Sequence, residues 1–155
     1  MNNLINGVFV NELVTHSDDR GFFRELLRIP FESSDNRYKV GQISHSEVLP
    51  NILKAWHAHL YQYQWTYIAK GNCIVALADR RKNSETFDQV LTFTAGDSTR
   101  KILYGFPPGV YHGYKNLGDT AQVIYITSGQ YDLKDELRLD PYQNGIDFSW
   151  SSYSD

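Results

Sequence analysis

Three histidines in the middle of the chain are the residues best suited to chemistry. His57 and His59 are separated by one alanine, Gln64 follows them, and His112 lies in the later segment PPGVYHGYKN, residues 107–116. An imidazole can ligate a transition metal, and near neutral pH it can also give or take a proton. The three histidines therefore predict either a metal site or acid–base chemistry on a bound ligand.

Short β-rich runs separated by turn residues carry these histidines. Turn signals recur roughly every 8–12 residues, which is typical of a sandwich or barrel. Only residues 132–137 are expected to be helical. We predict an all-β jelly roll that forms a single domain over residues 1–155. The expected strands are residues 7–10, 21–27, 40–46, 52–59, 65–69, 73–78, 89–93, 101–104, 110–115 and 121–127.

Composition excludes several classes of partner. The 155 residues are 41% hydrophobic and 21% charged, with a net charge of −3, so general attraction to nucleic acid or to an anionic membrane is not expected. Cys73 is the only cysteine, and its apolar neighbours favour buried packing over reactivity. Neither a secretory signal nor an 18-residue apolar run is present, so we expect a cytoplasmic protein.

Two motifs resemble the halves of the double-stranded β-helix (cupin) signature. The first is His57-Ala58-His59 with Gln64 and Gly71, and the second fits P-x-G-x-x-H-x-x-x-N over residues 107–116. The resemblance implies that the three histidines converge inside one small barrel. In metal-binding cupins a Glu usually stands at the Gln64 position, so no metal ligand is predicted. A three-histidine site for Fe, Mn, Ni or Zn stays open as an alternative.

Further motifs extend the resemblance to one family of sugar-nucleotide cupins, the dTDP-4-dehydrorhamnose 3,5-epimerases. They cover about residues 18–148 and occur in the family's order. The segments that carry the resemblance are DRGFFRE (19–25), QISHS (42–46), KAWH (54–57), DRRKNSETF (79–87), HGY (112–114), LDP (139–141) and GIDF (145–148).

The resemblance implies a catalytic set that needs no cofactor. His57 matches the family's base and Asp140 the aspartate that orients it, because a carboxylate beside an imidazole fixes its tautomer and raises its basicity. Tyr125 matches the acid that returns a proton to the opposite face of the sugar. The residues implied in substrate binding are Arg20, Glu25, Gln42 and Lys54 for the nucleotide and diphosphate, His59, Gln64 and His112 for the sugar, and Tyr131 at the mouth.

The chain departs from the family at three of these places. Family epimerases carry an Arg where Lys54 stands, an Asn where Ser44 stands and a Lys where Gln64 stands. A lysine would hold an enolate oxygen by a charged hydrogen bond worth about 1.5–3 kcal/mol, against about 0.5–1.5 kcal/mol for a neutral amide. Gln64 could still donate to that oxygen, or a protonated His112 could supply the charge.

The expected function is epimerisation at C3, C5 or both of a nucleotide-diphosphate 4-keto-6-deoxy sugar, for polysaccharide or glycoside synthesis. We expect a homodimer in which residues 1–40 contact the partner. His57-x-His59 with Gln64 is also similar to the sugar-nucleotide 3,4-ketoisomerases, which are the nearest alternative. A metal-dependent cupin enzyme and a binding module without catalysis are the others.

Overall fold

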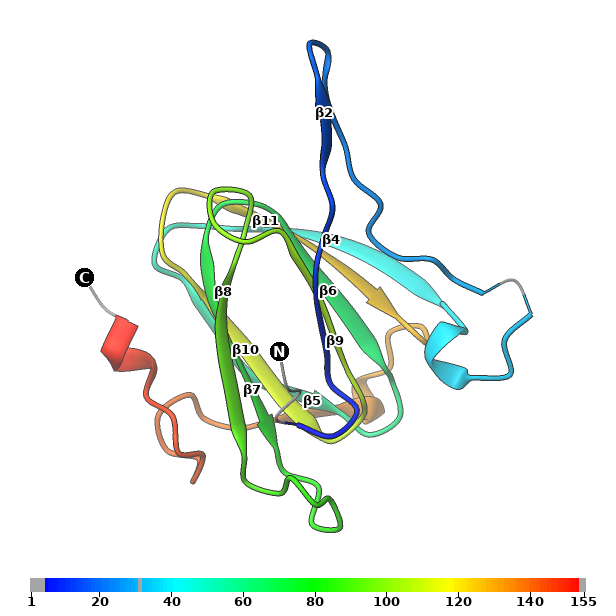
Figure 1. The fold of residues 1–155 in the computed structure, drawn as a ribbon. Coiled ribbons are helices and arrows are strands. Elements are labelled where there is room, and N and C mark those ends of the chain that lie inside the picture. The colour runs from blue at the N-terminus through cyan, green and yellow to red at the C-terminus, as the bar shows by residue number, and fades with distance from the viewer. Residues whose placement is uncertain (1–4, 31, 154–155) are drawn as a thin grey trace.

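Two five-stranded antiparallel sheets pack face to face in the computed structural model, which describes residues 5–30 and 32–153 (Figure 1). The first sheet has the order β1 (Phe9–Glu12), β9 (Ile102–Phe106), β6 (Gln64–Lys70), β11 (Ala121–Thr127) and β4 (Gln42–Val48). The second has the order β12 (Glu136–Arg138), β5 (Leu53–His59), β10 (Val110–Asn116), β7 (Cys73–Asp79) and β8 (Val90–Ala95). The chain crosses repeatedly between the sheets, and this confirms the predicted all-β jelly roll.

The prediction of a helix at residues 132–137 is wrong. A single 3-10 turn, η2 (Leu133–Asp135), is capped by Asp132 and is followed directly by β12. The chain extends there because β12 pairs with β5, which places Glu136 opposite His59. The remaining helical turns are η1 (Asn36–Tyr38) and η3 (Trp150–Tyr153). In the described ranges no helix is long and apolar enough to cross a membrane.

The main core lies between the sheets. Its fully buried side chains come from both layers, among them Val48, Ile68, Leu77 and Val123. Alternation along each strand turns one set of side chains to this core. The core ends beside the histidines, since the Phe106 ring lies 4.2 Å from the His112 ring, centroid to centroid.

Strand β7 is buried on both faces, unlike the strands whose outer face meets solvent. Val75 and Leu77 enter the core between the sheets, whereas Ile74 and Ala76 join a second cluster around Trp150. The C-terminal segment thus covers the outer face of the second sheet. A central strand covered on both sides reads as a continuous apolar run, as residues 73–78 do.

Two residues of the cupin-like motifs serve the turns. Gly109 has φ +81°, and a Cβ there would lie 2.6 Å from Cγ of Arg81, so only glycine fits without a shift. Asn116 is fully buried, and its Nδ2 donates to the carbonyls of Val48, Leu49 and Asp119. Gly109 and Asn116 therefore stabilise the two ends of β10 and have a structural role.

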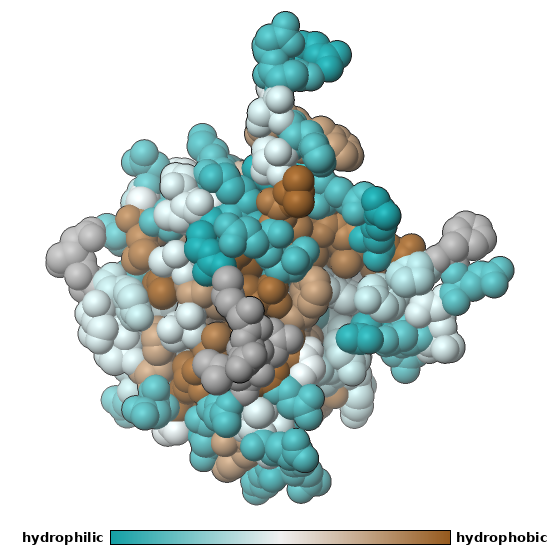
Figure 2. Space-filling model, in the orientation of Figure 1, coloured by the Kyte–Doolittle hydropathy of each residue, from teal (hydrophilic) through white to brown (hydrophobic). Residues whose placement is uncertain are grey.

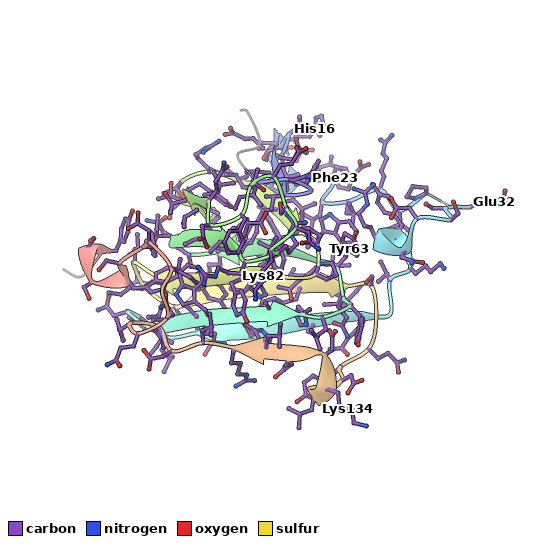
Figure 3. All side chains as sticks on the ribbon, turned by 90° about the horizontal axis from the view of Figure 1, so that it is seen from below. His16, Phe23, Glu32, Tyr63, Lys82 and Lys134 are labelled. Atoms are coloured by element: carbon purple, nitrogen blue, oxygen red, sulfur yellow. The ribbon has the colours of Figure 1, made fainter. Side chains whose placement is uncertain are left out.

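A hairpin formed by β2 (His16–Asp18) and β3 (Gly21–Phe23) projects from the body of the molecule (Figure 1). Its tip is polar, and apolar surface lies below it (Figure 2). Phe22 and Phe23 are 65% and 68% exposed. The Phe23 ring stacks on that of His16. Both of these side chains are labelled in Figure 3. The hairpin belongs to the predicted contact segment, of which residues 1–4 and 31 lie outside the described part of the chain.

Candidate active site

A cavity of about 530 Å³ opens between the two sheets and collects most of the predicted site residues. The strands bring side chains to it from opposite sides: β5, β10 and β12 from one sheet, β4, β6 and β11 from the other. The lining includes His57, His59, His112, Gln64, Tyr125, Gln42, Lys54 and Tyr131, and also Ser44, Tyr114, Glu136 and Arg138.

The three histidines form one cluster, as predicted. His57 and His59 lie two positions apart on β5, and His112 on β10 is the register partner of His57. The ring centroids are 4.9, 5.3 and 5.8 Å apart, and the imidazole nitrogens nearest one another all lie within 4.8 Å. This donor set could hold a transition metal, so the open alternative remains chemically sound.

His57 is held as a neutral imidazole. Burial lowers its pKa, the neighbouring His59 lowers it further, and the carboxylate of Glu136 partly opposes both. The Nε2 atom is buried without a hydrogen-bond partner among the described residues, and Oε1 of Glu136 lies 3.5 Å from it. A neutral, half-buried imidazole beside a carboxylate is suited to accept a proton.

His59 is locked by the protein on both ring nitrogens. Its Nδ1 lies 2.9 Å from Oδ2 of buried Asp135, and its Nε2 lies 3.2 Å from Oε1 of Gln64. Gln64 in turn donates from Nε2 to the hydroxyl of Thr66 at 2.9 Å. His59 and Gln64 therefore belong to a buried hydrogen-bond network, and both side chains form part of the cavity wall.

His112 does not carry the positive charge that a missing lysine would have supplied. Burial lowers the pKa of His112 well below its usual value, and the nearby His57 and His59 lower it further. Its Nδ1 faces the Val110 carbonyl at 3.4 Å. The imidazole therefore stays neutral at pH 7, and the suggestion that a protonated His112 supplies the charge is corrected.

The structure does not bring Asp140 to His57. Asp140 is exposed, and its Oδ1 accepts the backbone N–H groups of Tyr142 and Gln143, both at 2.8 Å. Its carboxylate thus closes the turn that follows β12. The carboxylate beside His57 belongs to Glu136, which sequence reasoning missed because strand register is not a local property.

Tyr125 reaches the cavity from β11, in the sheet opposite His57. Its hydroxyl shares hydrogen bonds with the hydroxyl of Tyr114 at 2.5 Å and with that of Ser46 at 2.9 Å. Sequence reasoning missed both partners. Alternation along β4 places Ser46 on the same face as Ser44, and this was the available signal.

The residues predicted to hold the nucleotide separate into two groups. Gln42 and Lys54 line the cavity, and the Gln42 side chain accepts the backbone N–H of Tyr131 at 2.9 Å. Arg20 and Glu25 do not line it: Arg20 pairs with Asp18 in the projecting hairpin, and Glu25 pairs with Arg28. Both residues lie on exposed surface.

An unpredicted arginine also stands at the cavity. Arg138 lies on β12, its side chain is 72% exposed, and its Nη2 donates to Oε2 of Glu136 at 2.8 Å. The same carboxylate therefore lies between His57 and a guanidinium. A guanidinium fork at the mouth of a cavity suits an anionic group such as a diphosphate.

Comparisons with known proteins identify relatives of the chain. The family model described as dTDP-4-dehydrorhamnose 3,5-epimerase matches residues 2–155. The spore coat polysaccharide biosynthesis protein SpsL of Bacillus subtilis is 36% identical over 152 residues, covering 96% of this chain and 98% of that protein. The crystal structure of a dTDP sugar isomerase from Desulfovibrio desulfuricans has a TM-score of 0.84 at 29% identity, with 96% and 93% of the two chains covered.

A more distant structure shows the same fold. ChmJ, a 3'-monoepimerase from Streptomyces bikiniensis solved with dTDP-quinovose, superposes with a TM-score of 0.84 at 22% identity, covering 94% of this chain and 76% of that one. At this identity the likeness concerns the fold alone. The resemblance noted in the sequence is thus confirmed at the level of family and architecture.

Proposed function

The chain belongs to the dTDP-4-dehydrorhamnose 3,5-epimerase family, and we propose that it inverts C3, C5 or both in a nucleotide-diphosphate 4-keto-6-deoxy sugar. One observation carries the proposal. His57, a neutral imidazole, and Tyr125, a phenol, project into a single cavity from opposite sheets. Inversion of a carbon beside a ketone requires a base on one face and an acid on the other.

The reaction consists of two proton transfers. His57 takes the proton from the carbon beside the 4-keto group, which leaves an enolate. Tyr125 then gives its hydroxyl proton to the opposite face of that carbon, and the ketone re-forms. The imidazolium loses its proton to solvent and the phenolate regains one, so the enzyme returns to its starting state with no cofactor.

Glu136 takes the orienting role that the resemblance assigned to Asp140. Its side chain is 10% exposed, and Oε1 faces Nε2 of His57 at 3.5 Å. A proton on Nε2 directed at this carboxylate would leave the Nδ1 lone pair as the base. The carboxylate also favours the imidazolium that forms during the reaction.

Substrate binding is proposed to use the cations at the cavity mouth. Lys54 and Arg138 line the cavity and are suited to a diphosphate. A nucleotide sugar is also the ligand that the ChmJ crystal structure contains. The residue at position 64 is a neutral glutamine, so enolate charge is held here without the charged hydrogen bond that a lysine would supply.

A homodimer is part of the proposal. The β2–β3 hairpin projects from the body of the molecule and presents two exposed phenylalanines (Figure 1). Packing against a partner would bury them, and it would give Arg20 and Glu25 a role that they lack within one subunit.

Product identity tests the proposal against its nearest alternative. The protein is incubated with dTDP-4-keto-6-deoxyglucose and the sugars are identified by NMR. A product that keeps the 4-keto group and is inverted at C3 or C5 supports the epimerase. Accumulation of a 3-keto sugar, with a Tyr125→Phe variant as active as the wild type, would establish the 3,4-ketoisomerase instead.

The metal alternative is favoured by one observation, the nitrogen cluster within 4.8 Å. Elemental analysis and chelation separate it from the epimerase. We expect the chelator-treated protein to keep its epimerase activity. Near-stoichiometric Fe, Mn, Ni or Zn, together with activity that disappears on chelation and returns with that metal, would replace the base mechanism.

A further inference from the structure

The hydroxyl of Tyr125 sits between two other hydroxyls that come from different sheets. Ser46 lies on β4, the strand next to β11 in the same sheet, and its Oγ is 2.9 Å from the phenol oxygen. Tyr114 lies on β10 in the opposite sheet, and its oxygen is 2.5 Å away. The Tyr125 oxygen is thus held from both layers of the fold.

Both neighbours keep their protons. Tyr114 is 4% exposed and packs in the main core. Burial is the main cause that raises its pKa far above that of a free phenol, and the nearby Tyr125 raises it further. Ser46 carries an aliphatic hydroxyl, which does not ionise near neutral pH. The other phenol close by, on buried Tyr104, is also kept protonated by burial. No cation contacts the Tyr125 oxygen among the described residues, so these hydroxyls are the hydrogen-bond partners available to it.

We propose that Tyr114 and Ser46 form a two-hydroxyl cradle that stabilises the phenolate left on Tyr125 after it protonates the sugar. The inference rests on the proposed function. The Tyr125 O–H bond breaks, a C–H bond forms on the sugar, and the new negative charge accepts O–H hydrogen bonds from both neighbours. Neither neighbour gives up its proton. Tyr114 and Ser46 are therefore positioning residues that act through Tyr125.

Hydrogen bonds to an ion are stronger than those to a neutral group, so the cradle favours the state after proton transfer over the state before it. An interaction realised only after the charge has developed raises kcat and leaves KM unchanged. It also acts on the acid step alone. Proton removal by His57 on the other face of the sugar does not form the phenolate.

Tyr114→Phe tests the cradle, because it removes one oxygen and keeps the ring in the core. We expect kcat for inversion to fall about tenfold or more, with KM unchanged. Deuterium exchange of the sugar proton in D2O should fall less, so that exchange without inversion becomes visible. Ser46→Ala, on another strand, should also raise the ratio of exchange to inversion. This variant tests the cradle if Tyr114→Phe fails to fold.

A double-variant cycle ties the effect to Tyr125. In a Tyr125→Phe background, adding Tyr114→Phe should cause no further loss of inversion, since no phenolate forms there. Tyr111→Phe is the matched control: it lies on the same strand but packs in the outer cluster around Trp150, and it should behave as the wild type.

Two results would overturn the cradle. One is wild-type inversion by both Tyr114→Phe and Ser46→Ala. The other is an equal fall of exchange and inversion in both variants, which indicates general damage to the site. Wild-type protein that inverts neither C3 nor C5 would instead refute the proposed function, so the two failures are distinguishable.

Discussion

At the scale of single residues, the proposed base is a histidine whose surroundings favour its uncharged form. Burial and the adjacent His59 lower the pKa of His57, while Glu136 raises it. A base must be unprotonated to act, so activity should persist at pH values below the ordinary histidine pKa of about 6.5. The activity is lost only as the pH falls through the lowered pKa.

Glu136→Gln tests which carboxylate serves His57. Removing the charge that raises the His57 pKa should move the acid limb of the kcat/KM–pH profile to lower pH. The plateau should fall on the order of tenfold, because the base is weaker and less well oriented. Both effects are read from initial rates between about pH 4.5 and 8.

Asp140→Asn provides the comparison, because its carboxylate closes a turn outside the cavity. Its acid limb should coincide with that of the wild type. The opposite pattern, in which Asp140→Asn moves the limb and Glu136→Gln does not, would restore the dyad that the sequence resemblance implied.

The cupin-like motifs predicted part of this site. They implied that His57, His59 and His112 converge, and the three histidines do line one cavity. Asp135 and Glu136 could not be predicted, since their positions depend on how β12 registers against β5. Alternation could place Ser46 on the face of Ser44, but the contact of Tyr114 with Tyr125 joins two sheets and could not be predicted from spacing.

At the scale of elements, a network of hydrogen bonds around Asp79, at the end of β7, fixes the β7–β8 loop and joins it to the N-terminal segment; we call it the tie. Asp79 is fully buried, and its carboxylate accepts hydrogen bonds from Arg81, Ser84 and Thr86. Burial by itself would raise the pKa of Asp79, but these donors hold it well below its usual range. Arg81 also donates to the Asn6 carbonyl, which links the β7–β8 loop to the N-terminal segment.

Asp79→Asn should therefore destabilise the fold. It removes a buried charge whose partner stays in place, and such a change costs about 3–5 kcal/mol in the free energy of unfolding. Urea denaturation measures it. Asp88→Asn is the control, because Asp88 pairs with Arg80 at the surface and should cost less than about 1 kcal/mol. Equal losses in the two variants would argue against the tie.

The elements themselves were largely predictable, and the errors have physical causes. Alternating and continuous apolar runs located every strand of the two main sheets except β12. Residues 132–137 resembled a helix locally, but a lone turn is costly to extend, and residues 136–138 pair with β5 instead. The motif DRRKNSETF marked the family in the sequence, yet its role as a tie became visible only from the contacts of Asp79.

At the scale of the whole molecule, the projecting hairpin is the feature on which the proposed dimer depends. A Phe22→Ser/Phe23→Ser double variant should shift the protein from dimer to monomer in sedimentation at micromolar concentration, because it removes the exposed aromatic surface that a partner would cover. Tyr142→Ser, equally exposed but outside the hairpin, should leave the dimer intact. A monomeric wild type, or a double variant as dimeric as the wild type, would contradict this assembly.

Proton exchange at the sugar tests the central claim, that His57 enolises a 4-keto sugar without a metal, most directly. Chelator-treated wild type and His57→Asn are incubated with dTDP-4-keto-6-deoxyglucose in D2O, and the C3 and C5 proton signals are followed by NMR. We predict that at least one signal disappears with the wild type and that His57→Asn slows this by about a hundredfold or more. Exchange that requires added metal, or that survives unchanged in His57→Asn, would contradict the account.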